Sequence, residues 1–253
     1  MSKSVIAAQM YTVREFTKTP KDIAESLAKL KSLGYEAVQL SALGPIDTKE
    51  LANMLQGEGL TAAATHVSWD RLRNEPEAVV EEHKILGCKH AAIGSMPGDY
   101  RSEEGIVRFA KEASEVAARL AQDGLTFSYH NHSFEFERFG ERTLMQALIE
   151  ESDPALGMEI DTYWVQHGGG DPADWIRKVK GRIPIVHLKD MTMRGREQLM
   201  AEVGEGNLNW PAILDACREA GVEWYCVEQD ICQRDPFESL GISIRNLRAM
   251  GLA

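Results

Sequence analysis

The feature that most constrains the fold is an alternation, repeated eight times, of a short apolar run with a longer segment of helical periodicity. In the first unit, an apolar run at residues 5–10 precedes apolar residues at helical spacing over residues 20–33, where Pro20 suits a first turn and Gly34 suits an end. Short apolar runs bounded by polar residues are typical of buried strands. The other runs expected as strands are residues 37–41, 60–68, 90–95, 125–132, 157–161, 183–189 and 223–229.

Segments with helical spacing follow these runs, at residues 20–33, 51–55, 76–86, 103–122, 143–150, 172–179, 210–220 and 236–250. Eight strand-helix units at a spacing of roughly 30 residues predict an α/β fold, a closed (β/α)8 TIM barrel. No low-complexity linker divides the units, so we expect a single domain over residues 1–253. A doubly wound open sheet is the competing architecture. Such a sheet usually has a glycine-rich turn after its first strand, but the segment at that place here is MYTVREF, which contains no glycine.

Charge and composition argue against several classes of protein. The formal net charge of −11 opposes binding to nucleic acid or to an anionic membrane, because like charges repel at long range. No apolar run approaches the roughly 20 residues that a membrane span needs, and no cleavable leader pattern is present. The four cysteines have no CxxC spacing, which favours reduced thiols. We therefore expect a cytoplasmic protein that acts on a small molecule.

Titratable residues gather where strands are expected to end. In a barrel, catalytic side chains come from the C-terminal ends of the strands and the loops after them. The residues expected there are His66, His130, His132, Glu135, Asp161, His187 and Glu228. Imidazoles and carboxylates without cysteine suit a hard or borderline divalent ion such as Mn²⁺, Mg²⁺, Co²⁺ or Zn²⁺. One such ion is the predicted cofactor.

Structural roles without a metal are also open for Asp161, His187 and Glu228. Asp161 could cap a turn, and His187 could be a hydrogen-bonded core histidine. Glu228 follows a mostly apolar strand, so its carboxylate must be paired or metal-bound if it is buried. Their arrival at the ends of consecutive strands favours a shared metal ion.

The segment FSYHNHSFEFER (residues 127–138) is the densest in such groups. Side chains alternate in direction along a strand, so His130 and His132 are expected on one side, where they could exchange protons near neutral pH or bind the metal. Glu135 lies in the following loop, from which it could turn back toward the ion, and Glu137 is the weaker carboxylate candidate. The plainer alternative is a polar strand end with solvated histidines.

Six motifs in order along the chain resemble one known family. They are YHNHSFEF (129–136), EIDTYW (159–164), GGGDPADWI (168–176), HLKDM (187–191), EVGEGNLNWPAIL (202–214) and VEQD (227–230). The chain resembles the xylose-isomerase-like barrel superfamily of sugar isomerases and epimerases over nearly its whole length. The resemblance implies one divalent ion held by a Glu, an Asp, a His and a second Glu, which are Glu135, Asp161, His187 and Glu228 here. His130 is the alternative to Glu135, because many relatives place the first ligand directly at the strand end.

DNA repair, which the superfamily also includes, is not expected. The histidine that apurinic-site endonucleases carry three residues after the aspartate is Trp164 here, and their Asp-x-His pair is absent. The expected partner is a carbohydrate, with neither nucleic acid nor membrane, and a homo-oligomer is left open.

The expected function is a metal-dependent sugar isomerase or epimerase that acts through an enediolate on a keto-sugar or related polyol ketone. Its catalytic groups would be His130, His132, Lys189 and Glu228, and its substrate contacts Gln9, His66 and Trp164. A lyase or dehydratase that acts on a keto-sugar or keto-inositol is the alternative, since elimination shares the first step. A non-catalytic sugar-binding barrel, or a subunit of a complex, is an alternative of another class. Gly204 and Gly206 leave open a phosphate-binding loop.

Overall fold

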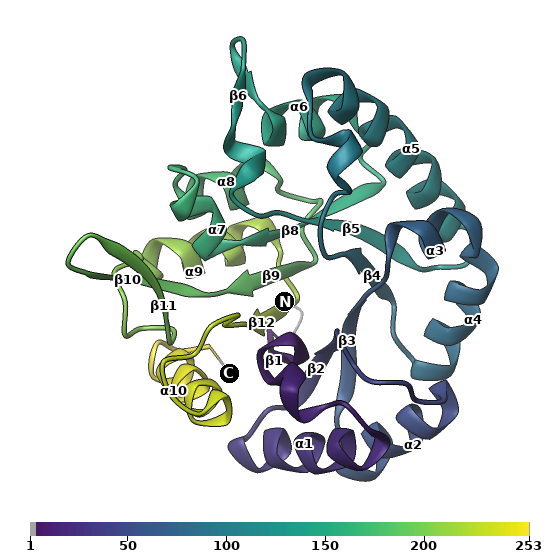
Figure 1. The fold of residues 1–253 in the computed structure, drawn as a ribbon, viewed down its shortest axis with the longest axis vertical. Coiled ribbons are helices and arrows are strands. Elements are labelled where there is room, and N and C mark those ends of the chain that lie inside the picture. The colour runs from purple at the N-terminus through teal and green to yellow at the C-terminus, as the bar shows by residue number, and fades with distance from the viewer. Residues whose placement is uncertain (1–3, 253) are drawn as a thin grey trace.

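Eight parallel strands close into a barrel within residues 4–252, the part of the chain that the computed structural model describes (Figure 1). Their order around the barrel is β1-β12-β9-β8-β5-β4-β3-β2. The strands are Val5–Gln9 (β1), Ala37–Leu40 (β2), Thr61–His66 (β3), His90–Ile93 (β4), Thr126–His130 (β5), Leu156–Asp161 (β8), Ile185–Leu188 (β9) and Trp224–Val227 (β12). The predicted TIM barrel is confirmed. The expected single domain also includes residues 1–3 and 253, which lie outside the described residues.

Helices form a ring around the barrel (Figure 1). The α-helices are Pro20–Leu33 (α1), Thr48–Glu58 (α2), Trp69–Asn74 (α3), Pro76–Leu86 (α4), Glu103–Ala121 (α5), Leu144–Glu151 (α6), Thr162–His167 (α7), Pro172–Lys178 (α8), Trp210–Ala220 (α9) and Pro236–Ala249 (α10). Short 3-10 helices lie at Met10–Phe16 (η1), Gly98–Tyr100 (η2) and Phe134–Phe136 (η3). None of the helices in this part of the chain is both long and apolar enough to cross a bilayer.

Local sequence explains why these helices begin and end where they do. The Thr19 side chain accepts a hydrogen bond from the Asp22 N–H while Asp22 reaches back to the Thr19 N–H, which forms a capping box ahead of α1. The helix ends at Gly34, whose φ of 102° lies in the left-handed region that glycine tolerates. The Asp171 side chain accepts a hydrogen bond from the Asp174 N–H and so caps α8, with Pro172 at its first position.

The inside of the barrel is divided into an apolar layer and a polar layer. Ala7, Ala37, Ile185 and Cys226 belong to one small cluster of buried residues. Because side chains alternate along a strand, the residues two positions further on share this inward face and lie nearer the C-terminal ends. Those residues are Gln9, Gln39, His187 and Glu228, and all of them are buried. The polar layer thus lies at the mouth.

Two hairpins extend this architecture beyond what the sequence predicted. Asp190–Arg194 (β10) pairs with Glu197–Ala201 (β11), and Arg138–Phe139 (β6) pairs with Arg142–Thr143 (β7), both antiparallel. Strand β5 ends at His130, two residues earlier than expected, so the loop that carries Glu135 begins at Asn131.

Candidate active site

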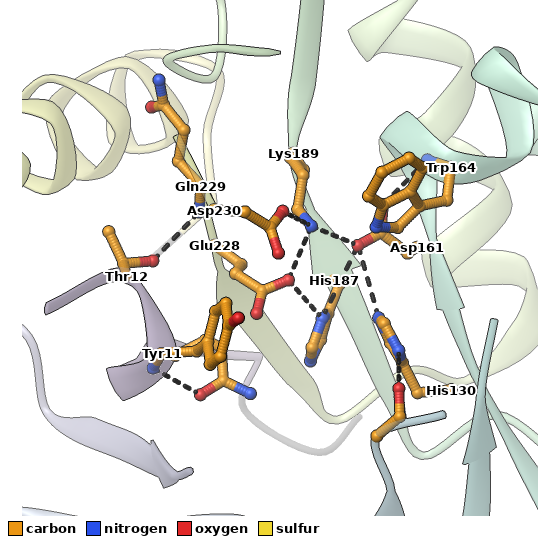
Figure 2. Close-up of polar contacts among 12 residues, drawn as sticks. Tyr11, Thr12, His130, Asp161, Trp164, His187, Lys189, Glu228, Gln229 and Asp230 are labelled. Atoms are coloured by element: carbon orange, nitrogen blue, oxygen red, sulfur yellow. Dashed lines mark hydrogen bonds and ion pairs between the residues drawn. The ribbon is translucent and has the colours of Figure 1, made fainter. Parts of the chain in front are cut away.

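Four side chains from neighbouring strands meet at the mouth of the barrel. His130, Asp161, His187 and Glu228 stand at or near the C-terminal ends of β5, β8, β9 and β12, which are consecutive around the barrel. Each offers one ligand atom, and these four atoms all lie within 4.8 Å of one another. All four side chains are buried, and Figure 2 shows them pointing toward one another.

The oxygens of the two carboxylates are the centre of this group. Asp161 Oδ2 lies 3.4 Å from His130 Nε2 and 3.7 Å from His187 Nδ1. Glu228 Oε2 lies 3.1 Å from His187 Nδ1. The ammonium of Lys189 lies 3.0 Å from Asp161 Oδ2, 2.7 Å from Glu228 Oε2 and 2.5 Å from Asp230 Oδ2. One lysine therefore contacts three carboxylates.

Burial and charge act in opposite directions on these groups. Burial alone would raise the pKa of Asp161 and of Glu228, but the ammonium of Lys189 and the neighbouring imidazoles outweigh it and lower the pKa of both. Burial alone would lower the pKa of Lys189, but its three carboxylate neighbours raise it. Both carboxylates are therefore ionised at neutral pH, and the ammonium is retained.

The two imidazoles are held with a ring nitrogen free for a metal ion. His130 Nδ1 lies 3.0 Å from the Gly94 carbonyl oxygen, which can only accept, so Nδ1 carries the proton and Nε2 faces Asp161. A metal-binding histidine commonly donates its second N–H in this way. With two carboxylates, this donor set suits a hard or borderline divalent ion. The residues present fit the predicted metal.

A chain of hydrogen bonds below the mouth orients His187. Gln39 Nε2 donates to Glu159 Oε1 at 2.6 Å, so the amide oxygen of Gln39 faces His187 Nε2, 2.7 Å away. That oxygen accepts only, which places the proton on Nε2 and leaves Nδ1 toward Asp161 and Glu228. His66 Nε2 lies 2.8 Å from the other oxygen of Glu159. Burial alone would raise the pKa of Glu159, but His187 and His66 lower it.

Glu135 lies away from this group. Its Oε1 accepts from the Tyr129 hydroxyl at 2.6 Å and its Oε2 from the His132 N–H at 3.0 Å. Tyr129 alternates with His130 along β5 and packs outward against Phe109 of α5, with ring centroids 5.5 Å apart. The structure thus brings His130, and not Glu135, together with Asp161, His187 and Glu228. Glu137, the weaker candidate, begins the chain toward the β6–β7 hairpin.

A cavity of about 360 Å³ opens beside the four side chains. Its lining residues are Tyr11, Ser41, Ala42, His66, Val67, Ser68, Gly94, Ser95, His130, His132, Glu228 and Asp230. His132 packs against Trp164, with ring centroids 5.3 Å apart, and burial together with His130 lowers the pKa of His132 to about 3. His132 is therefore neutral at physiological pH.

The other expected substrate contacts lie close to the mouth. Gln9 is fully buried, and its Nε2 has no hydrogen-bond partner among the described residues. The same holds for Trp164 Nε1 and His132 Nδ1. Buried polar atoms are normally paired, so unpaired ones at a mouth are groups that a ligand can satisfy. Neither Gln9 nor Trp164 is among the residues that line the cavity itself.

Sequence reasoning missed Gln39, Glu159, Asp230 and Tyr11. Glu159 precedes Asp161 by two residues in β8, so strand alternation alone could have placed both on the inward face. Gln39 is the polar residue of a buried strand, which is the same kind of signal. Asp230 had a weaker signal, because it lies three residues beyond Val227, the last residue of β12.

Comparisons with known proteins agree with this architecture. The family described as xylose isomerase-like TIM barrel matches residues 27–250. Inosose dehydratase of Geobacillus kaustophilus is 30% identical over 189 residues, which are 65% of this chain and 61% of that protein's length. A sugar phosphate isomerase/epimerase from Parabacteroides distasonis has a TM-score of 0.81 at 22% identity and covers 98% of this chain and 95% of its own. A probable 3-DHS dehydratase from Bacillus anthracis has a TM-score of 0.73 at 13% identity, with 98% and 99% covered.

Proposed function

The chain belongs to the xylose isomerase-like TIM barrel family, and from this we propose that it is a metal-dependent isomerase or epimerase of a keto-sugar or related polyol ketone. One observation carries the proposal. The ligand atoms of His130, Asp161, His187 and Glu228 lie within 4.8 Å of one another, and two of these residues, His130 and Glu228, line the cavity. Carbonyl and hydroxyl oxygens of a small polyol could reach the same point.

We assign the metal to His130, Asp161, His187 and Glu228. His130 replaces Glu135, the ligand that the family resemblance implied, because both oxygens of Glu135 accept hydrogen bonds from Tyr129 and from the backbone of His132. When bound, a divalent ion supplies a Lewis acid that polarises the substrate carbonyl and acidifies the neighbouring C–H.

We assign proton transfer and charge stabilisation to Glu228, Lys189 and His132. The Glu228 carboxylate is ionised and lines the cavity, so it can accept the proton from the carbon next to the carbonyl. The Lys189 ammonium is fully buried beside three carboxylates and lies 5.4 Å from the centre of the Trp164 ring. A substrate oxygen that replaces one of these carboxylates could accept a hydrogen bond from it as negative charge develops there. Neutral His132 can accept a hydrogen bond from a hydroxyl. Return of the proton to the neighbouring carbon gives isomerisation, and return to the opposite face gives epimerisation.

Solvent exchange tests this proposal directly. The protein supplied with Mn²⁺ is incubated in D₂O with a panel of ketoses and inososes, and each recovered compound is analysed by mass spectrometry and NMR. We expect one deuterium at the carbon next to the carbonyl, together with an isomer or epimer and no loss of water. The Asp161→Ala variant should neither hold the metal nor promote exchange. Exchange that is equally fast in this variant would overturn the proposal.

Dehydration is the second candidate, and the similarity to inosose dehydratase favours it. The same proton removal would be followed by loss of the oxygen substituent on the next carbon, which needs an acid. Asp230 lines the cavity, and burial together with Glu228 raises its pKa, which suits it to that role. A product lighter by one water in the same experiment would select this reaction. Metal binding with no reaction of any panel member would favour a non-catalytic sugar-binding barrel.

A further inference from the structure

The loop that the sequence suggested for phosphate binding already holds an anion of the protein itself. Asp190 begins β10 directly after Lys189, and its side chain is fully buried. Its carboxylate accepts five hydrogen bonds of 2.6–3.2 Å, from the backbone N–H groups of Met191, Gly204, Gly206 and Leu208 and from the indole N–H of Trp210. The N–H groups of Gly204 and Gly206 therefore face inward, to Asp190.

The loop is fitted closely to that carboxylate. A Cβ atom added at Gly206 would lie 2.4 Å from Asp190 Oδ1 and 2.4 Å from the Met191 carbonyl oxygen. Only glycine permits this approach of backbone to carboxylate. A substrate phosphate would have to displace Asp190 in order to use these donors.

The cationic side chains around the mouth are also engaged elsewhere. Arg14 donates to the carbonyl oxygens of Tyr11 and Asp230, at 2.9 Å and 3.1 Å. Arg101 donates to the Met96 carbonyl oxygen at 2.8 Å and stacks on the Phe134 ring. Among the described residues that line the cavity, none is lysine or arginine, whereas Glu228 and Asp230 are acidic.

The charges at the centre leave no excess for a phosphate. The carboxyl groups of Asp161, Glu228 and Asp230 all lie within 3.0 Å of the single ammonium group of Lys189. Glu159, below His187, adds a further negative charge. A phosphate dianion would thus approach a centre in which carboxyl groups outnumber the one lysine, and like charges would oppose its binding.

The unpaired groups at the mouth suit hydroxyls instead. Gln9 Nε2 and Trp164 Nε1 are neutral donors, and His132 Nδ1 is a third buried polar atom without a partner among the described residues. Each can make a single hydrogen bond with an uncharged hydroxyl. The Tyr11 ring stands across the site from His130, where its flat face can contact the C–H groups of a polyol (Figure 2).

We propose that the substrate is an uncharged polyol without a phosphate group, and that Asp190 occupies the anion site that a phosphorylated substrate would need. This inference rests on the proposed function, because it describes the ligand of the same site.

Matched pairs of compounds test it. Binding to the protein supplied with Mg²⁺ is measured by saturation-transfer NMR for D-fructose and D-fructose 6-phosphate, D-xylulose and D-xylulose 5-phosphate, and myo-inositol and myo-inositol 1-phosphate. We expect the neutral member of at least one pair to bind about tenfold or more tightly than its ester, because like charge opposes the ester. Inorganic phosphate should not displace it.

A variant ties the binding to the mouth. Gln9→Leu should weaken binding of the neutral polyol about tenfold, since it removes an unpaired donor, whereas Gln122→Leu, at an exposed position beyond α5, should not change it. An ester that binds as tightly as its parent, displacement by inorganic phosphate, or no binding of any neutral member would each overturn the inference. A neutral polyol that binds without proton exchange would instead reject the proposed reaction and leave this inference standing.

Discussion

The Oε1 atom of Gln39, on β2, lies 2.7 Å from Nε2 of His187, on β9, three strands away around the barrel. The two residues are 148 positions apart in the chain. Because Glu159 fixes the direction of the Gln39 amide, this contact decides which nitrogen of His187 carries the proton. Gln39 is not a proposed metal ligand, but it sets the tautomer of one, His187.

Gln39→Leu should therefore weaken metal binding without removing any ligand. Loss of an outer partner of a metal-binding histidine typically costs about 10- to 100-fold in affinity. Titration calorimetry with Mn²⁺ measures this directly, and circular dichroism checks the fold. Gln122→Leu is the matched control. Equal Mn²⁺ affinity in the two variants would show that Gln39 does not orient His187 for metal binding.

His130→Ala and Glu135→Gln should separate the two candidates for the ligand from the β5 region. We expect His130→Ala to lower Mn²⁺ affinity at least tenfold, because Nε2 faces Asp161. Glu135→Gln should keep the affinity within about twofold but lower the free energy of unfolding by about 1–3 kcal/mol, because a buried hydrogen-bonded carboxylate is replaced. The reverse pattern of metal affinities would restore Glu135 as the ligand.

Gly206→Ala should destabilise the protein by about 1–3 kcal/mol, since the added methyl would press on Asp190 Oδ1 and on backbone. Gly57→Ala offers the contrasting case, because this helical glycine in α2 has nothing within 4 Å of the added Cβ. Gly57→Ala should raise the free energy of unfolding by about 0.5–1 kcal/mol. Urea unfolding of both variants measures the difference. A Gly206→Ala protein as stable as the parent would mean that the loop is not fitted to Asp190.

His83 makes stability depend on pH. Its Nδ1 lies 2.7 Å from the Val79 carbonyl oxygen and its Nε2 lies 2.8 Å from the Thr65 hydroxyl, and burial lowers its pKa below 6.5. The unfolded chain therefore binds more protons than the folded protein below pH 6.5, and stability falls as the pH falls through that value.

The contribution of His83 is at most about 1.4 kcal/mol per pH unit. Urea unfolding at pH 8.0 and at pH 5.5 should show a smaller difference for His83→Gln than for the parent. His167→Gln, at an exposed position, should keep the parent's difference. An unchanged difference in His83→Gln would contradict the assignment.

How much the sequence predicted depends on whether a residue's direction is set locally. Strand alternation sets the direction of Asp161, His187 and Glu228, and the structure brings these three side chains together. Glu135 lies in a loop, and its direction depends on the packing of Tyr129 against α5, which no local pattern encodes. The pairing of Gln39 with His187 depends on how strands distant in the chain are staggered around the closed barrel. The hydrogen bonds to Asp190 could not be predicted from local sequence either. Their donors follow the β10–β11 hairpin and lie up to 20 positions further along the chain.

The four proposed ligands all come from β5, β8, β9 and β12, one contiguous half of the barrel. The other half, β1–β4 (purple to blue in Figure 1), supplies most of the remaining cavity wall through Tyr11, Ser41, Ala42, Val67, Ser68 and Ser95. The side chains that shape this part of the cavity can therefore be changed without replacing any of the four proposed ligands. A library restricted to those six positions is a compact way to retarget the enzyme to new compounds.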